Sequence, residues 1–183
     1  MKKTESMLLS RRGKYLLIVS AALTAAVCLV MNLALIPAIE RGAGGLRCFD
    51  MKGYYSPDYA REFLAAISAE AREIYRFRQL PLDFFYPFAY SVFFIGAFTR
   101  LQKKLGAPAL LPLLLAAFDY AENICEARLL SADGVIPPAA AAAGGICTAV
   151  KTALMYLCFL CLIVFLVRAV IRRRKNAGAV SRP

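Results

Sequence analysis

The sequence predicts an all-α membrane protein, a bundle of four transmembrane helices with an amphipathic helical segment in its first outer loop. Three observations predict this fold. The 183 residues are 60% hydrophobic and only 19% charged, whereas soluble domains are nearer half apolar and a quarter charged. The apolar residues form long uncharged runs, and basic residues gather in short blocks beside them, as in segments that stay in the cytoplasm. This length suits a single integral membrane domain, residues 1–183.

The first apolar run predicts an uncleaved transmembrane helix. Lys14 and Glu40 bracket 25 uncharged residues, and a helix needs only about 20 apolar residues to span a bilayer. A signal peptide also has a basic start, but its apolar region is shorter and ends at a cleavage site of small residues. We therefore expect the first transmembrane helix at about residues 15–38.

Two later runs predict the second and fourth spans. Sixteen uncharged residues follow Asp83, and they predict a helix at about 82–100. Another sixteen precede Arg168, and they predict a helix at about 145–168 with Lys151 inside it. Both helices extend beyond their uncharged cores, because sixteen residues are slightly too few to cross a bilayer.

The third span follows from charge rather than from hydropathy. Residues 105–118 are only fourteen uncharged residues, too few to cross alone. The basic blocks at 100–104 and 168–175 should both be cytoplasmic, so an even number of crossings must separate them. The fourth helix supplies one crossing. A helix at about 108–130 must supply the other and carry its acidic residues with it.

The resulting topology places both termini in the cytoplasm. We expect a multi-pass protein of the bacterial cytoplasmic membrane, with loops 40–82 and 131–144 outside. The larger loop contains seven basic and six acidic residues, so it lacks the bias of the cytoplasmic blocks. Its stretch Ser56-Pro57-Asp58 is a typical helix start, and apolar residues then recur at helical spacing. This pattern predicts an amphipathic helical segment at 56–79.

Most polar residues inside the spans fall in the outer half of the predicted bundle. Four of them share one face of the third helix, because they are spaced i, i+3, i+4 and i+7. They are Asp119, Glu122, Asn123 and Glu126. Polar residues at similar depth on the second and fourth helices are Asp83, Tyr86, Tyr90 and Lys151. A proton or ion pathway needs polar stations on both sides of the midplane, so this distribution favours a cavity that opens outward.

Composition also excludes several kinds of site. The chain has no histidine, which removes histidine-based nucleophilic catalysis and the commonest zinc ligand. The net charge of +11 lies in blocks without interleaved aromatic residues, so we expect no nucleic-acid partner. Cys158 and Cys161 form a C-x-x-C motif amid apolar residues, and we interpret them as packing residues. Cys125 and Cys147 could form a disulfide or pack as small apolar side chains. The sequence requires no cofactor, and we assign no metal ligand.

The order of the polar motifs carries a resemblance. The motif residues are Gly53-Tyr54, Ser56-Pro57, Arg72, Tyr75, Asp83, Tyr86-Pro87, Tyr90, Pro112, Asp119 and Glu122-Asn123. Together they resemble a family of small uncharacterised bacterial four-helix integral membrane proteins with D-x-x-Y-P-x-x-Y and D-x-x-E-N motifs. The match covers about residues 53 to 123. The resemblance implies a four-helix membrane protein and supplies no activity.

We expect a membrane protein without enzymatic activity, whose outward-facing polar pocket binds a small molecule or a lipid headgroup. Buried ionisable residues within a membrane are costly and usually mark function. The pocket candidates are Asp83, Tyr86, Tyr90, Asp119, Glu122, Asn123 and Lys151. Arg72 and Arg76, just before the second helix, are candidates for a lid or for binding an anionic headgroup.

Other interpretations stay open at this point. One is a carboxylate-dependent membrane enzyme acting on a lipid, with Asp119 or Glu122 as acid or base. A metal could assist it, because Asp83, Asn123 and both acids offer hard oxygen ligands. Another is an accessory subunit whose polar face meets a partner membrane protein. A purely structural role is the last: Lys151 pairs with Glu122 to fix two helices, or extends to the membrane surface without a partner.

Overall fold

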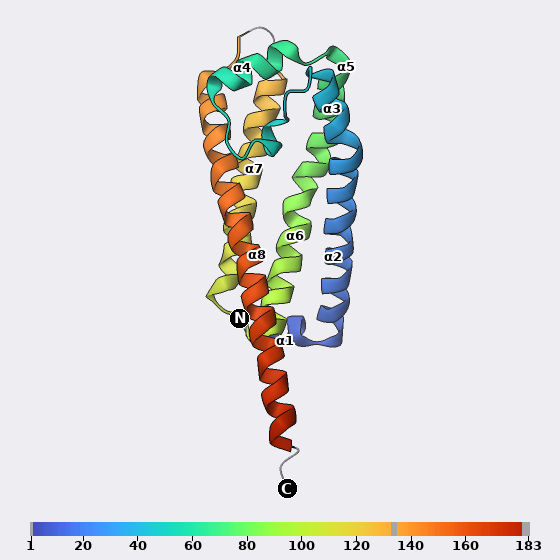
Figure 1. The fold of residues 1–183 in the computed structure, drawn as a ribbon, viewed down its shortest axis with the longest axis vertical. Helices are drawn as coiled ribbons and strands as arrows, with labels where there is room; N and C mark the ends of the chain where they lie inside the picture. The colour runs from blue at the N-terminus through green and yellow to red at the C-terminus, as the bar shows by residue number, and fades with distance from the viewer. Residues whose placement is uncertain (1, 133–134, 181–183) are drawn as a thin grey trace.

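The computed structural model describes residues 2–132 and 135–180, and all the regular structure in them is helical. Figure 1 shows four long helices that run along the longest axis of the molecule. They are α2 (Arg11–Val30), α6 (Leu80–Gln102), α7 (Leu110–Leu130) and α8 (Pro138–Val180). Two short helices, α4 (Pro57–Ala66) and α5 (Ala69–Ile74), cover one end, which we call the loop end. Helix α1 (Lys2–Leu9) and the last turns of α8 lie at the opposite end.

Three helical segments are long and apolar enough to cross a membrane. They are Arg11–Gly42, Ala69–Gln102 and Pro138–Lys175. Helix α7 is not among them, because three buried acids interrupt its apolar sequence: Asp119, Glu122 and Glu126. It nevertheless packs along α8 and α6 (Figure 1). The structure thus confirms an all-α chain with membrane-length helices.

Two π-helical turns interrupt the long segments near the loop end. The first, η1 (Met31–Leu35), joins α2 to α3 (Ile36–Gly42), so this helix continues past the predicted end at residue 38. The second, η3 (Tyr75–Gln79), joins α5 to α6. The two turns contact each other. π-Helical turns recur at functional sites, because the extra residue re-aims the side chains around it.

The outer segment 56–79, predicted as amphipathic and helical, is divided into more than one helix. Ser56 caps α4 by accepting a hydrogen bond from the Tyr59 amide at 3.2 Å, which confirms the predicted helix start. The backbone becomes extended at Ile67, and Ser68 caps α5 in the same way. The Ser68 amide also donates to the Gly42 carbonyl at 2.8 Å. The break therefore anchors the outer segment to the end of α3.

Helix α8 begins at Pro138, earlier than the predicted start at residue 145. The alanine run 139–143 forms its first turns, since alanine has the highest helix propensity and proline suits the first turn. Gly144 and Gly145 follow, and a Cβ atom on Gly145 would overlap the carbonyl oxygen of Tyr55. These glycines let the backbone of the outer loop lie directly on α8.

The loop end has its own apolar core. Four aromatic side chains pack together with almost no exposed surface: Phe49, Tyr55, Phe63 and Tyr75. A second apolar cluster lies further down, between α6, α7 and α8, and Cys158 is buried in it. All six cysteines belong to the described residues and are free, including Cys125 and Cys147. Burial of Cys158 supports its interpretation as a packing residue.

Candidate functional site

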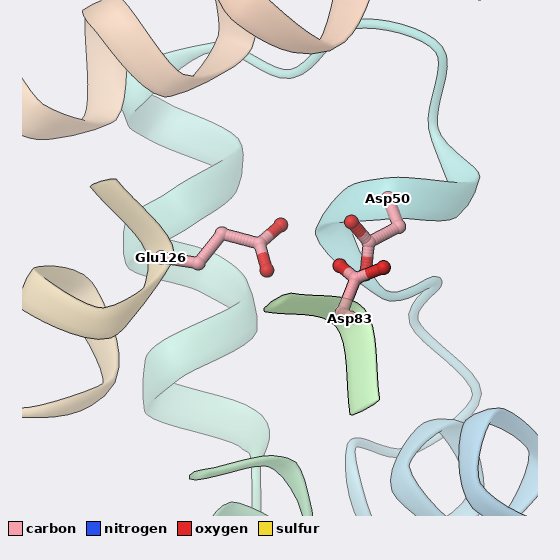
Figure 2. Close-up of side chains that lie close together, drawn as sticks. All are labelled: Asp50, Asp83 and Glu126. Atoms are coloured by element: carbon pink, nitrogen blue, oxygen red, sulfur yellow. The ribbon is translucent and has the colours of Figure 1, made fainter. Parts of the chain in front are cut away.

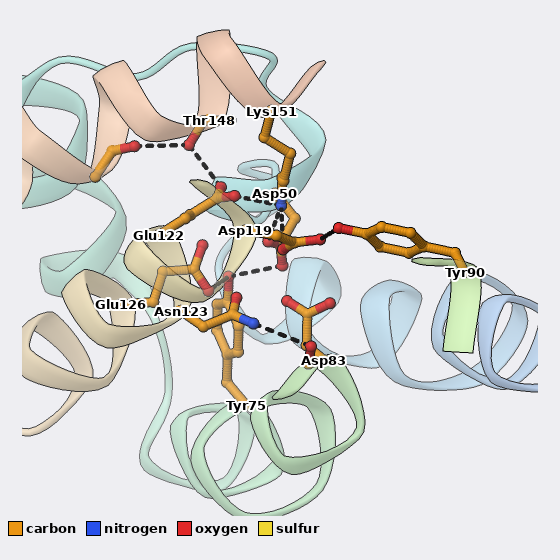
Figure 3. Close-up of polar contacts among 11 residues, drawn as sticks. Asp50, Tyr75, Asp83, Tyr90, Asp119, Glu122, Asn123, Glu126, Thr148 and Lys151 are labelled. Carbon is orange, nitrogen blue, oxygen red and sulfur yellow. Dashed lines mark hydrogen bonds and ion pairs between the residues drawn. The ribbon is translucent and has the colours of Figure 1, made fainter. Parts of the chain in front are cut away.

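Lys151 lies at the centre of a buried polar network just below the loop end (Figure 3). Its ammonium nitrogen lies 3.2 Å from Asp50 Oδ1 and 3.3 Å from Asp119 Oδ1, and it also pairs with Glu122 Oε2. The lysine side chain is only 12% exposed. The ammonium group therefore does not extend to the membrane surface. It joins α8 to α7 and to the outer loop.

The carboxylates around the lysine are held by hydroxyl groups. Thr148, one turn before Lys151 on α8, donates its hydroxyl to Glu122 Oε1 at 2.6 Å. Tyr90, from α6, donates to Asp119 Oδ2 at 2.8 Å. Each hydroxyl satisfies the carboxylate oxygen that the lysine does not contact. Both acids are thus fixed in position, and the ion pairs gain the extra hydrogen bonds that buried charges require.

Asp50 is a member of the site that sequence reasoning missed, as it also missed Thr148 and Tyr75. It lies in the 3-10 turn η2 (Phe49–Met51) of the outer loop, outside the membrane-length helices. Its carboxylate binds Lys151 through one oxygen and lies 3.5 Å from the Tyr75 hydroxyl through the other. The signal in the sequence is slight: one acid between two apolar residues, Phe49 and Met51.

Asp83 and Asn123 are linked through a proline. Pro87 lies inside α6, where it has no N–H to donate to the carbonyl four residues earlier. That carbonyl belongs to Asp83, and it accepts a hydrogen bond from Asn123 Nδ2 at 3.0 Å instead. Asn123 therefore supplies the hydrogen bond that Pro87 cannot donate to the Asp83 carbonyl. This contact fixes the register of α7 against α6.

A double-mutant cycle tests this linkage. Asn123→Ala leaves the buried carbonyl without a donor, and we expect it to lower the free energy of unfolding by about 1–3 kcal/mol. Pro87→Ala restores the missing N–H, so Asn123→Ala should cost less than about 1 kcal/mol in that background. Reversible unfolding in mixed micelles measures all four proteins. The control is Pro81→Ala, an exposed proline in the first turn of α6; an equal cost in all backgrounds would contradict the linkage.

A second group of carboxylates lies beside the lysine (Figure 2). Asp50, Asp83 and Glu126 each direct a carboxylate oxygen to the same place, and these oxygens lie within 4.8 Å of one another. Glu126 is fully buried, and its Oε2 lies 3.2 Å from the Tyr75 hydroxyl. The site therefore contains five carboxyl groups and a single lysine, which pairs with three of them. Asp83 and Glu126 take part in none of the ion pairs of the described residues.

Two adjacent cavities lie between the helical segment Arg11–Gly42 and α8, and both are also lined by residues of α6. The upper cavity, about 250 Å³, is polar on one side, where Asp50, Asp83, Asp119 and Lys151 line it. The lower cavity, about 220 Å³, is almost wholly apolar and is lined by residues such as Ala25, Phe94 and Phe159. Tyr86 and Met155 line both cavities. Exposed Asn32 and Tyr156 form part of the upper lining, so this cavity reaches the surface between η1 and α8.

The structure brings together most of the residues that the sequence singled out. Asp83, Tyr86, Tyr90, Asp119, Glu122, Asn123 and Lys151 all lie in the network or line its cavities. Arg72 and Arg76 do not. Arg72 donates to the Ala132 carbonyl at 3.3 Å, which ties α5 to the end of α7. The Arg76 guanidinium lies over the Phe77 ring. Neither arginine lines a cavity of the site, so the expected lid or headgroup role has no geometric support.

Comparison with known proteins found no family model, no curated protein and no solved structure that matches the chain. The resemblance drawn from the sequence motifs stays an expectation.

Proposed function

We propose that the chain is a four-span membrane protein that binds an amphipathic molecule, a lipid or a lipid-like small molecule, in the groove between α2 and α8. One observation carries the proposal: a cavity lined on one side by Asp50, Asp119 and Lys151 adjoins an almost wholly apolar cavity of similar size. A headgroup in the upper cavity would meet Asp119 and Lys151, and a hydrocarbon chain in the lower one would meet Ala25 and Phe159.

The charges of the upper cavity indicate the kind of headgroup. The site contains five carboxyl groups and one lysine, and a group buried beside them gains most if it carries a positive charge. The lining also offers hydrogen-bond acceptors at Asp50, Asp83 and Asp119. We therefore propose an amine-bearing headgroup as the preferred ligand chemistry. The aromatic core of the outer loop closes the loop end above it, so entry is from the side, through the bilayer.

The proposed topology has four crossings, with α7 as the third and the loop end outside. Figure 1 supports an even number, because α1 and the last turns of α8 lie at the same end of the molecule. The polar face of α7 does not prevent its crossing, since Asp119, Glu122 and Glu126 are buried against protein rather than lipid. Basic residues gather at the end opposite the loop end, which supports a cytoplasmic position for that end in a bacterial cell.

Cysteine labelling in intact cells tests this topology. Ala65 is exposed on α4 and Lys104 is exposed beyond the end of α6. We expect a membrane-impermeant maleimide to label Ala65→Cys in whole cells, and Lys104→Cys only after permeabilisation. Native Cys48 gives little background, because burial and the charges of Asp50 and Glu40 raise the pKa of its thiol. Labelling of Lys104→Cys in intact cells would reverse the topology.

Lipid retention tests the binding function. The full chain is purified from nanodiscs that contain equal parts of phosphatidylethanolamine and phosphatidylglycerol, and native mass spectrometry identifies the lipids that remain bound. We expect phosphatidylethanolamine, whose headgroup carries an amine, to be retained at least about tenfold over phosphatidylglycerol, which corresponds to about 1.4 kcal/mol.

A matched pair of variants locates the bound lipid. Ala25 and its neighbour Ala26 are both exposed, but only Ala25 lines the lower cavity and Ala26 lines neither cavity. Ala25→Phe should fill the lower cavity and abolish retention, and Ala26→Phe should leave it unchanged. Equal retention in both variants would contradict binding in the groove. Conversion of the retained lipid to a new species would favour the carboxylate-dependent enzyme instead.

A further inference from the structure

Three carboxylates that come from separate elements converge beside the lysine network. Asp50 comes from the outer loop, Asp83 from the first turn of α6, and Glu126 from α7. Figure 2 shows their carboxyl groups facing one another. Like charges held this closely repel each other and raise the free energy of the folded state. Something in the folded protein must neutralise them.

The chain itself supplies too few partners for this group. Lys151 contacts Asp50 Oδ1, and it also pairs with Asp119 and Glu122. The Tyr75 hydroxyl can donate one proton, to either Asp50 or Glu126. Within the described residues, Asp83 Oδ2 and Glu126 Oε1 are buried without a hydrogen-bond partner.

Asn123 adds an independent observation. Its side chain is fully buried, and donation to the Asp83 carbonyl fixes the orientation of its amide group. Figure 3 shows this amide lying between Asp83 and Glu126, on the side of the carboxylates. Its oxygen, Oδ1, has no hydrogen-bond donor among the described residues. A buried amide oxygen without a hydrogen-bond donor raises the free energy of the folded state. The same oxygen is a good ligand for a cation.

We propose that Asp50, Asp83, Glu126 and the amide oxygen of Asn123 bind a hard divalent cation, Ca²⁺ or Mg²⁺. Carboxylate and amide oxygens are the ligands these ions prefer, and oxygen atoms around one Ca²⁺ are each about 2.3–2.6 Å from it. Oxygens on opposite sides of such an ion are therefore about 5 Å apart, in keeping with the 4.8 Å limit on the three carboxylates. The upper cavity, lined by Asp50 and Asp83, gives an ion access to the site. This site does not depend on the proposed lipid function.

Direct metal titration of the full chain is the first test. The protein is purified in detergent with a chelator, exchanged into metal-free buffer, and titrated with Ca²⁺ and with Mg²⁺ by calorimetry and by thermal melting. We expect saturable binding of one ion per chain and a melting temperature that rises with metal concentration, as for any ligand of the folded state. No heat of binding and no shift at millimolar concentrations of either ion would overturn the proposal, and would indicate that protons neutralise these acids.

Variants then test the ligands. Glu126→Gln and Asp83→Asn keep the size of each side chain and remove its charge, so both should weaken metal binding by at least about tenfold. Asp58→Asn is the matched control, because Asp58 is an exposed acid of α4, and its binding should equal that of the native chain. Terbium offers a second readout that needs no melting transition, since Tyr75 is close enough to sensitise Tb³⁺ luminescence in the site. Binding that is unchanged in both ligand variants would place the ion elsewhere and overturn the assignment.

These tests separate the metal site from the lipid site. Lipid retention is measured in chelator-treated protein, and metal binding in detergent without added phospholipid. Metal binding without retention of an amine-bearing lipid would contradict the proposed function but not the metal site. Lipid retention without metal binding would contradict the metal site but not the proposed function.

Discussion

Lys151→Met is expected to destabilise the protein by about 3–5 kcal/mol, because it leaves three buried carboxylates without their cation. Methionine is similar to lysine in length and in its apolar stem. The loss of stability therefore measures removal of the positive charge rather than a change in packing. Lys151 contacts Asp50, Asp119 and Glu122, which join the outer loop and two helices. We expect reversible unfolding in mixed micelles to show the loss, together with partial release of the outer loop. Release would expose Cys48, which is fully buried in the native chain, to maleimide.

The double variant that carries Lys151→Met and Glu122→Leu distinguishes loss of an ion pair from nonspecific destabilisation. Removing both partners of a buried ion pair is less costly than removing one, so Glu122→Leu should cost less in the Lys151→Met background than in the native chain. Recovery is partial, because Asp50 and Asp119 still lack their cation. Lys104→Met, at an exposed position, is the control and should have little effect. Strictly additive losses from Lys151→Met and Glu122→Leu would show that the two residues do not interact.

Asp119→Asn is expected to weaken the proposed ligand binding strongly while leaving the fold nearly intact. The amide keeps the size of the carboxylate and can still accept the hydrogen bond from Tyr90, and Lys151 retains Asp50 and Glu122 as partners. We therefore expect a stability loss of no more than about 1.5 kcal/mol, the net value of one hydrogen bond. Removing a charged acceptor from the upper cavity should weaken binding of an amine headgroup by about 10- to 100-fold.

The two readouts assign the role of Asp119. Thermal melting in detergent reports the fold, and lipid retention by native mass spectrometry reports the cavity. Glu62→Gln, an exposed change on α4, should alter neither. A lower melting temperature with unchanged retention would make Asp119 a structural residue. A variant that is normal in both measurements would contradict both interpretations.

Local sequence patterns predicted the helices and one face of the site. Runs of uncharged residues indicate membrane-length helices because a bilayer sets the number of apolar residues required. The spacing of Asp119, Glu122 and Glu126 on one face follows from helical periodicity alone. Counting residues from the ends of the two predicted helices indicates that Lys151 and Glu122 lie at similar depth in the bundle. These inferences need only geometry within a helix, which the sequence contains.

The missing parts of the site depend on contacts between distant segments. Asp50 belongs to a short turn whose position is set by Tyr55 lying on the glycines of α8, and no spacing in the sequence expresses that contact. Tyr75 is the first residue of a π-helical turn, which changes the register of its helix and which local residue preferences do not indicate. Arg72 was associated with the pocket through proximity in sequence, but its hydrogen bond is to the end of α7.

The position of Lys151 on α8 also affects how the protein is made. A ribosome synthesises Asp50 and the acids of α7 before it reaches the only lysine that pairs with them among the described residues. In the proposed topology, α7 would enter the membrane before Lys151 is made, so Asp119 and Glu122 would lack their cation until α8 arrives. A nascent chain that stops before Pro138 would leave Asp50, Asp119 and Glu122 without that cation.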